Sequence, residues 1–186
     1  MEKHEEGTPA RTGKSILSFV LMVAAVFAFV WLMKTFVYQA YTIPTGSMEN
    51  TIMVGDMLFA EKISYLHGEP EPGDIVTFQD PRSSESRVLI KRVIAVGGQT
   101  IDIADGMVWI DGEALEEPYV VGVTAPLASY DVSYPYTVPD GCIWVMGDNR
   151  QNSSDSRAFG AVSLDNVLER AVFIYWPFSH FGSVYK

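Results

Sequence analysis

The longest apolar run of the chain lies near its N-terminus. From Ser15 to Met33 the sequence SILSFVLMVAAVFAFVWLM contains no charged residue. At a rise of ~1.5 Å per residue, about 20 helical residues cross the roughly 30 Å hydrocarbon core of a bilayer. The pattern therefore predicts a transmembrane anchor, which we place at residues 15–38.

A cleaved signal peptide is the alternative interpretation of this run. The apolar stretch is longer than the usual apolar region of a signal peptide, which has about 7–15 residues. The best nearby cleavage site, Tyr38-Gln39-Ala40, has a bulky tyrosine at the third position before the cut. We therefore expect a retained, single-pass anchor, preceded by a polar, disordered tail at residues 1–14.

Basic residues flank the anchor unevenly. Those before it are Lys3, Arg11 and Lys14, and those that follow are Lys34 and Lys62. Lys and Arg collect on the cytoplasmic side of membrane segments. The slight excess before the anchor predicts a cytoplasmic N-terminus and an extracytoplasmic domain at residues 39–186.

Beyond residue 40 the pattern changes to short runs of β-branched and aromatic residues, separated by Gly, Pro and Asp, which predict strands. These runs lie at 73–80, 86–96, 142–146 and 171–176. Between Thr100 and Asp111 the sequence alternates around Asp105-Gly106, the residue pair that a type I′ hairpin turn prefers. We expect a mainly β, mostly antiparallel domain with a small inserted β lobe at about 97–137.

Two further segments carry local predictions. Residues 163–170, SLDNVLER, have a helical pattern, with Ser163 as the N-cap. The aromatic residues near the C-terminus are expected in the core, the commoner place for such rings, although contact with lipid is an alternative. They are Tyr175, Trp176, Phe178 and Phe181.

Charge and cysteine content exclude several classes of function. The chain has 13 basic and 23 acidic residues, a formal charge of -10, which repels phosphate backbones and argues against a nucleic-acid partner. Cys142 is the single cysteine, so neither an intrachain disulfide nor a multi-cysteine metal site can form. Because Cys142 lies in an apolar run, we expect it to be a buried structural residue.

The candidate bases for hydrolytic chemistry are histidines and lysines. The histidines, His4, His67 and His180, lack a nearby Asp pattern, so a histidine triad is not expected. A lysine serves as a base when burial lowers its pKa enough to leave the amine neutral.

Lys91 has the surroundings that would lower its pKa, because the sequence VLIKRVI is apolar on both sides of it. Alternation along a strand puts Lys91 on one face and Arg92 on the other. A lysine on a solvated strand edge, which protects against aggregation, fits the same local sequence.

Ser47 is the candidate nucleophile, in the segment YTIPTGSMEN at 41–50. Gly46 allows a tight backbone and the close approach of a substrate chain. The backbone N–H of Ser47 and the hydroxyl of Thr45 could serve as donors to an oxyanion. Taken alone, however, the segment fits a plain Pro/Gly/Ser turn better.

Four segments in order resemble the type I signal peptidase family. They are Ser-Met after the anchor, GDIV at 73–76, IKRVIAVGGQ at 90–99 and GDNRQNSSDSR at 147–157. The resemblance implies a Ser/Lys serine protease with Ser47 as nucleophile and Lys91 as general base. Its implied fold is a β-rich catalytic core with an inserted lobe, like that of SOS-repressor proteases.

The resemblance also implies roles for supporting residues. Ser153 would hold the lysine amine by a hydrogen bond. Asp148 could pair with Arg92, while Asp155 and Arg157 would brace the loop. Thr45 stands where a serine is often found and Asn50 where a proline is frequent; the first departure puts the oxyanion role of Thr45 in doubt.

Substrate and location follow from the same resemblance. It implies removal of signal peptides from secretory preproteins at the plasma membrane, beside the export machinery, with a cut after small residues of the Ala-x-Ala type. No metal or organic cofactor is required. The substrate would add a strand beside the Ser47 segment. The pocket residues we expect are Tyr41, Ile43, Val76 and Ile90.

Two rival interpretations remain open at the level of the sequence. A self-cleaving regulator of the SOS-repressor type shares the dyad but predicts a DNA-binding domain, and residues 1–33 contain no helix-turn-helix pattern. A membrane-tethered β module without activity would retain every residue named above. Only a measurement of activity separates that module from the enzyme.

Overall fold

The computed structural model describes residues 10–83, 85–127 and 132–185. The chain divides into two units, one up to Val37 and the other from Tyr38 onward. The first unit is the helix α1 (Ala10–Phe36), in which Ile16–Phe36 has a mean hydropathy of 2.7 and is long and apolar enough to cross a membrane.

The start of α1 corrects one prediction. The helix begins at Ala10, so the expected disordered tail was wrong for residues 10–14, while residues 1–9 of that tail lie outside the described part of the chain. Ala, Arg and Lys are good helix formers, and a single glycine, Gly13, costs a helix only about 1 kcal/mol. The helical pattern of the anchor therefore extends into its polar flank.

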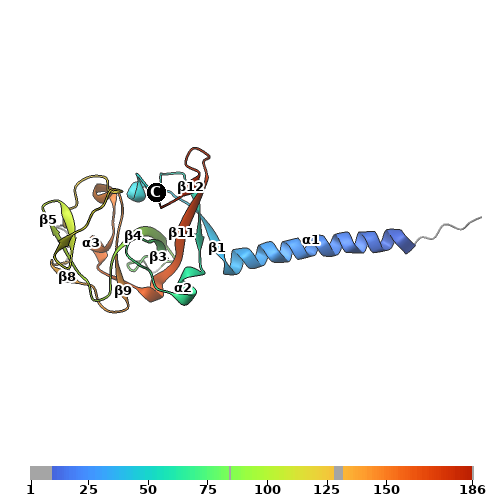
Figure 1. The fold of residues 1–186 in the computed structure, drawn as a ribbon, viewed down its shortest axis with the longest axis horizontal. Helices are drawn as coiled ribbons and strands as arrows, with labels where there is room; N and C mark the ends of the chain where they lie inside the picture. The colour runs from blue at the N-terminus through green and yellow to red at the C-terminus, as the bar shows by residue number, and fades with distance from the viewer. Residues whose placement is uncertain (1–9, 84, 128–131, 186) are drawn as a thin grey trace, which may run out of the picture. The chain divides into compact units, whose positions relative to one another are not determined.

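The second unit is built on an eight-stranded antiparallel sheet with the order β1-β2-β11-β3-β4-β9-β10, and β12 pairs with β11 (Figure 1). Its strands are β1 (Tyr38–Thr42), β2 (Met57–Glu61), β3 (Ile75–Gln79), β4 (Val88–Val96), β9 (Cys142–Met146), β10 (Val162–Ser163), β11 (Val167–Trp176) and β12 (Gly182–Ser183). The prediction of a mainly β fold after an N-terminal apolar helix is confirmed.

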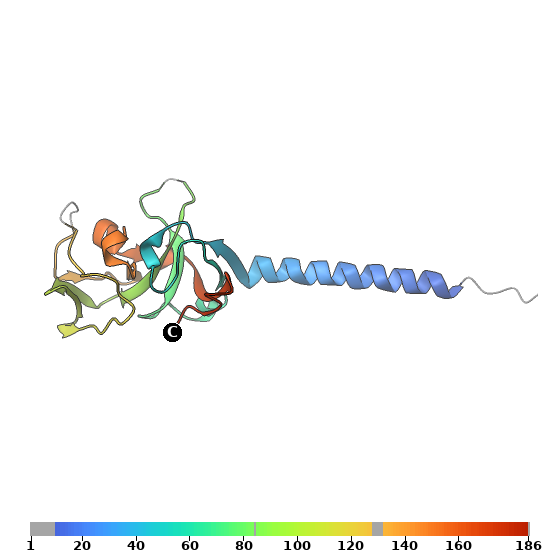
Figure 2. The ribbon, with the colours of Figure 1, turned by 90° about the horizontal axis from the view of Figure 1, so that it is seen from above.

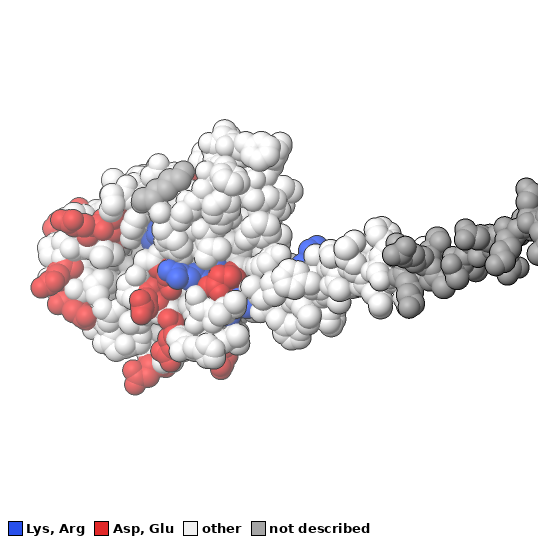
Figure 3. Space-filling view, turned by 45° about the vertical axis from the view of Figure 1, so that its right-hand side comes forward, with Lys and Arg blue, Asp and Glu red and all other residues white. Residues whose placement is uncertain are grey.

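A smaller sheet lies at one end of this unit (Figures 1 and 2). It has the order β7-β6-β5-β8, with β5 (Thr100–Ala104), β6 (Met107–Ile110), β7 (Glu113–Ala114) and β8 (Tyr136–Thr137). Asp105 and Gly106 between β5 and β6 have φ of 54° and 79°, as a type I′ turn requires. The predicted hairpin is therefore confirmed. Figure 3 shows acidic side chains gathered over this end of the unit.

The predicted helix at 163–170 was wrong. One turn of 3-10 helix, η3 (Leu164–Asn166), follows Ser163, whose Oγ accepts a hydrogen bond from the Asp165 N–H, and β11 then begins at Val167. Both edges of β11 are paired, with β2 on one side and β3 on the other. This tertiary pairing overrides the local helical pattern.

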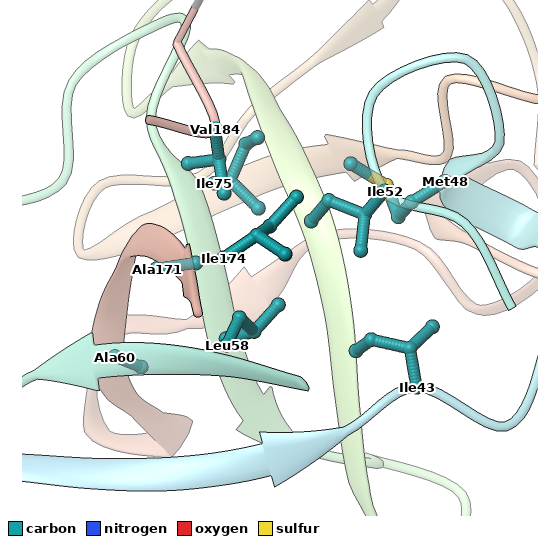
Figure 4. Close-up of a cluster of buried hydrophobic side chains, with 9 residues drawn as sticks. All are labelled: Ile43, Met48, Ile52, Leu58, Ala60, Ile75, Ala171, Ile174 and Val184. Carbon is teal, nitrogen blue, oxygen red and sulfur yellow. The ribbon is translucent and has the colours of Figure 1, made fainter. Parts of the chain in front are cut away.

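A cluster of buried side chains holds the segment after β1 against the main sheet. Its members, drawn in Figure 4, are Ile43, Met48, Ile52, Leu58, Ala60, Ile75, Ala171, Ile174 and Val184. Met48 and Ile52 are fully buried and lie just after Ser47 in the chain. The short helix η1 (Gly46–Met48), which contains Ser47, is therefore fixed to the core.

The predicted burial of the aromatic residues near the C-terminus and of Cys142 also needs correction. Trp176, Phe178 and Phe181 are not in the core; they are 49%, 74% and 58% exposed, because the chain leaves β11 at Trp176 and turns over the surface. Tyr175 is half-buried and stacks on Phe59. Cys142, at the start of β9, is half-buried at the margin of the cluster around Trp144.

Candidate active site

Ser47 and Lys91 meet in a buried contact. Lys91 Nζ lies 2.8 Å from Ser47 Oγ and 2.8 Å from the backbone oxygen of Ile90. The residues are 44 positions apart in the chain, and they are 7% and 3% exposed. The fold therefore brings a hydroxyl and an amine into hydrogen-bond contact away from bulk water.

The strand β4 sends Lys91 and Arg92 to opposite faces, as strand alternation requires. Lys91 is the cross-strand neighbour of Val76, and Arg92 is that of Ile75. Val76 packs in an apolar cluster with Phe78 and Val93, so Lys91 lies on the face of β4 that this cluster covers. Arg92 instead reaches Asp148 on the other face.

Burial lowers the pKa of Lys91 from 10.5 to about 8. The carboxylates of Asp155 and Asp148 oppose this shift, and the cations of Arg87 and Arg82 add to it. At pH 7 an amine with a pKa of about 8 is roughly one-tenth neutral, against ~0.03% for an ordinary lysine. The neutral amine can accept the Ser47 proton, which is the role of a general base.

Thr45 lies at the entrance to η1 with an extended backbone, φ -130° and ψ 151°. Its hydroxyl forms no capping hydrogen bond with that helix, and the residue is exposed. The hydroxyl is thus available beside Ser47 to donate to a negatively charged oxygen.

The loop after β9 packs directly on the nucleophile segment. The Asn149 N–H donates to the backbone oxygen of Ser47 at 3.1 Å. A Cβ added to Gly147 would lie 2.4 Å from the same oxygen and 2.3 Å from Ser153 Oγ. Only glycine allows this close approach, so residue 147 sets how near the loop comes to Ser47.

Two buried ion pairs brace this loop. Arg92 binds Asp148 at two points, Nε to Oδ1 at 2.9 Å and Nη2 to Oδ2 at 2.7 Å. Arg157 binds Asp155 in the same manner, at 2.8 Å and 2.9 Å, and Asp155 also accepts from the Gly147 N–H at 3.1 Å.

Comparison with known proteins identifies the family of this chain. The sequence model of the family described as signal peptidase, peptidase S26, matches residues 16–176. The chain belongs to the peptidase S26 signal peptidase family. It is therefore related to serine endopeptidases that process signal peptides.

Two signal peptidases are similar to this chain in sequence, and one solved structure is also similar to it. A probable signal peptidase I-1 of Synechocystis is 38% identical over 172 residues, 89% of this chain and 84% of the relative. Signal peptidase I of Mycobacterium tuberculosis is 34% identical over 235 residues, 98% of this chain and 79% of the relative. The crystal structure of a signal peptidase I from Enterococcus faecalis V583 is 30% identical, covers 55% of this chain and 97% of its own, and has a TM-score of 0.49.

Ser153 departs from the arrangement expected for the signal peptidase family. Its Oγ is buried and has no hydrogen-bond partner among the described residues, whereas Lys91 Nζ bonds to Ser47 and Ile90. The expected hydrogen bond from Ser153 to the lysine amine is therefore not formed. A buried hydroxyl without a partner costs about 1–3 kcal/mol, and this one borders Gly147.

The four residues that we expected to form the substrate pockets belong to two different hydrophobic clusters. Tyr41, Ile43 and Ile90 all contact the cluster that holds η1, and Tyr41 and Ile90 are half-buried. Val76 is fully buried in a different cluster, beside Lys91.

Sequence reasoning missed several polar residues of this site. Glu169, 5% exposed, accepts hydrogen bonds from the Tyr41 hydroxyl at 2.8 Å and from the Thr77 hydroxyl. Glu49 accepts from the Asn149 amide at 3.0 Å. The motif GDNR, which contains Asn149, could have pointed to that residue. No sequence pattern pointed to Glu49 or Glu169, because their hydrogen-bond partners Asn149 and Tyr41 lie 100 and 128 positions away in the chain.

Of the described histidines, neither His67 nor His180 has a hydrogen bond with Ser47 or Lys91. His180 Nδ1 lies 2.7 Å from Asp56 Oδ1, so one histidine does have the carboxylate neighbour that the sequence did not reveal. Ser47 Oγ is bonded to Lys91 instead. Among the described residues, no group of three or more His, Cys, Asp or Glu side chains is placed to hold a metal ion.

Proposed function

We propose that Ser47 and Lys91 form the dyad with which this protein removes signal peptides from preproteins. The observation that carries the proposal is the 2.8 Å contact between Ser47 Oγ and a buried Lys91 Nζ whose pKa is lowered to about 8. A serine hydroxyl is a weak nucleophile until a neighbouring base removes its proton. The neutral lysine supplies that base.

Acylation and deacylation use the same groups. Lys91 takes the proton of Ser47 Oγ as the oxygen attacks the scissile carbonyl, and the oxyanion is bound by the Ser47 N–H and the Thr45 hydroxyl. Lys91 then gives the proton to the leaving amine, and an ester forms on Ser47. Next, the neutral lysine takes a proton from water as the water oxygen attacks the ester. The Ser47 Oγ–carbonyl bond breaks, the lysine returns the proton to Ser47 Oγ, and the signal peptide leaves with a free carboxyl group.

We place the peptide-binding site between two strand edges that lead to the dyad. β1 ends the sheet order, so among the described strands its second edge has no partner. β9 pairs with residues 92–96 of β4, so one edge of residues 88–91 has no partner among the strands that the structure describes. An extended substrate would add to these edges, and the half-buried Tyr41 and Ile90 would form its shallow pockets.

Substrates are proposed to carry small residues at the first and third positions before the cut. We expect a precursor with an Ala-x-Ala site to be cleaved after the second Ala, and replacement of either Ala by Phe to lower kcat/KM by about tenfold or more. Mass spectrometry of the products locates the cut. Equal cleavage of the Phe-containing precursors would contradict the proposal.

We assign residues 15–38 to the membrane anchor and residues 39–186 to a catalytic domain on the extracytoplasmic face of the plasma membrane, beside the export machinery. Ile16–Phe36 supports the anchor, and the basic residues before it support a cytoplasmic N-terminus. A protease added to intact, wall-free cells should digest the domain and spare an N-terminal tag. Protection of the domain in intact cells would contradict this orientation.

Contact of the domain with lipid is proposed at the exposed rings of Trp176, Phe178 and Phe181. Three large rings that contact one another in water favour a partly apolar partner. Replacing the three by serine should lower activity in lipid vesicles and leave activity in detergent unchanged. An equal loss in both media would point to a structural role instead.

A further inference from the structure

The direction of the substrate follows from the chain itself and rests on the proposed function. β1 begins two residues after the helix α1 ends at Phe36, and it runs toward Ser47. A signal peptide in a membrane has its N-terminus on the same side as this anchor, and its apolar part also precedes the cut. Substrate and β1 therefore run parallel, and the residues after the scissile bond lie beyond Ser47.

The chain beyond Ser47 presents a carboxylate. A Cβ added to Gly46 would lie 2.6 Å from Glu49 Cδ and Oε1 and 2.8 Å from Oε2. The Glu49 carboxylate is therefore packed on the backbone of the residue that precedes the nucleophile. Glu49 as a whole is half-buried.

Asn149 fixes this carboxylate relative to the dyad. Its backbone N–H donates to Ser47 O at 3.1 Å, and its side-chain amide donates to Glu49 Oε2 at 3.0 Å. An amide is uncharged, so this contact orients the carboxylate without neutralising it. The structure thus holds a negative charge beside Gly46, in fixed relation to the nucleophile that follows it.

We propose that Glu49 forms an acidic subsite for the first residues of the mature protein and favours basic over acidic side chains there. Two unit charges about 4 Å apart in water interact strongly enough to change a rate about fivefold. Because the subsite is partly solvated, we expect the preference to be on the order of three- to tenfold and to weaken in high salt.

The test compares three precursors that share one signal peptide and carry Lys, Gln or Glu at the first two mature positions. For each enzyme variant, the ratio of kcat/KM for the Lys precursor to that for the Glu precursor is measured, so a general loss of activity cancels. Glu49→Gln removes the charge and keeps an oxygen that can accept from Asn149. Glu113→Gln, on the exposed strand β7, is the matched control for net charge.

We expect a ratio of about three to ten for the wild type and for Glu113→Gln, and about one for Glu49→Gln. A wild-type ratio of one, or a ratio that Glu49→Gln leaves unchanged, would overturn the subsite. Failure of the wild type to cleave any of the three precursors would instead overturn the proposed function, and this inference with it.

Discussion

Arg92 and Asp148 form a two-point ion pair on the face of β4 opposite to Lys91, with N···O distances of 2.9 Å and 2.7 Å. Burial lowers the pKa of Arg92, but the hydrogen bond and charge of Asp148 outweigh it, so the pKa is raised overall. Lys91, one residue earlier, contacts a neutral serine and has a lowered pKa. One strand thus holds a permanent cation for structure and a titratable amine for chemistry.

Removing Arg92 should destabilise the domain. Arg92→Ala leaves the Asp148 carboxylate buried without its cation, which typically costs about 3–5 kcal/mol. Arg87→Ala is the matched control, because Arg87 is exposed and replacing such a surface side chain usually changes stability by about 0.5 kcal/mol or less. Denaturant unfolding in detergent measures both values. Equal losses would contradict a structural role of the buried pair.

Adding one carbon to Gly147 should damage the site. In Gly147→Ala the new Cβ meets Ser47 O and Ser153 Oγ at under 2.5 Å, so the loop has to move away from the nucleophile. A displacement of about 1 Å can lower activity on the order of 100-fold. Gly68→Ala is the control, because its nearest contact is 3.4 Å and its φ is -145°. Full activity of Gly147→Ala would show that catalysis does not need the close contact between this loop and Ser47.

The rate should follow the ionisation of Lys91. Because the neutral amine is the base and its pKa is about 8, kcat/KM should rise about tenfold per pH unit below pH 8 and level off above it. A stopped assay over pH 6 to 10 gives the profile. Control by a group with a pKa near 6.5 would indicate a histidine, and a rise that continues to pH 10.5 would indicate a solvated lysine.

Lys91 should also lower stability at neutral pH. Its pKa is about 8 in the folded state and 10.5 when unfolded, so the unfolded chain binds more protons between these values and wild-type stability rises with pH across this window. Below pH 8, burying the charged amine of Lys91 lowers the free energy of unfolding by about 3 kcal/mol relative to its value above pH 10.5.

Lys91→Met removes the cost of burying the charged amine. We expect the mutant to be more stable than the wild type at pH 7, with an advantage that shrinks from pH 8 to pH 10.5. Unfolding free energies of the two proteins at several pH values measure the difference. A difference that does not change with pH would show that Lys91 is not buried as a neutral amine.

Local patterns were sufficient for elements with a local cause. The Asp105-Gly106 turn and the apolar run at 142–146 gave the hairpin and β9 with correct bounds. The segment 163–170 was misassigned because partners far away in the chain, in β2 and β3, decide its conformation. The exposure of Phe178 likewise depends on where the chain goes after β11.

The site shows the same division. Strand alternation separated Lys91 from Arg92, and motif order linked Lys91 to Ser47, which the fold places 2.8 Å apart. The orphaned hydroxyl of Ser153 and the contact between Glu49 and Gly46 depend on side-chain positions within ångströms. No periodicity or spacing in a sequence encodes positions at that scale.

The most direct test of the dyad is cleavage of an Ala-x-Ala precursor by the purified full-length protein in detergent, with Ser47→Ala compared under the same conditions. Mass spectrometry identifies the bond that is cut, and circular dichroism checks that the mutant is folded. We expect a single cut after the second Ala by the wild type and none by Ser47→Ala. Cleavage at the same bond by folded Ser47→Ala would contradict the account.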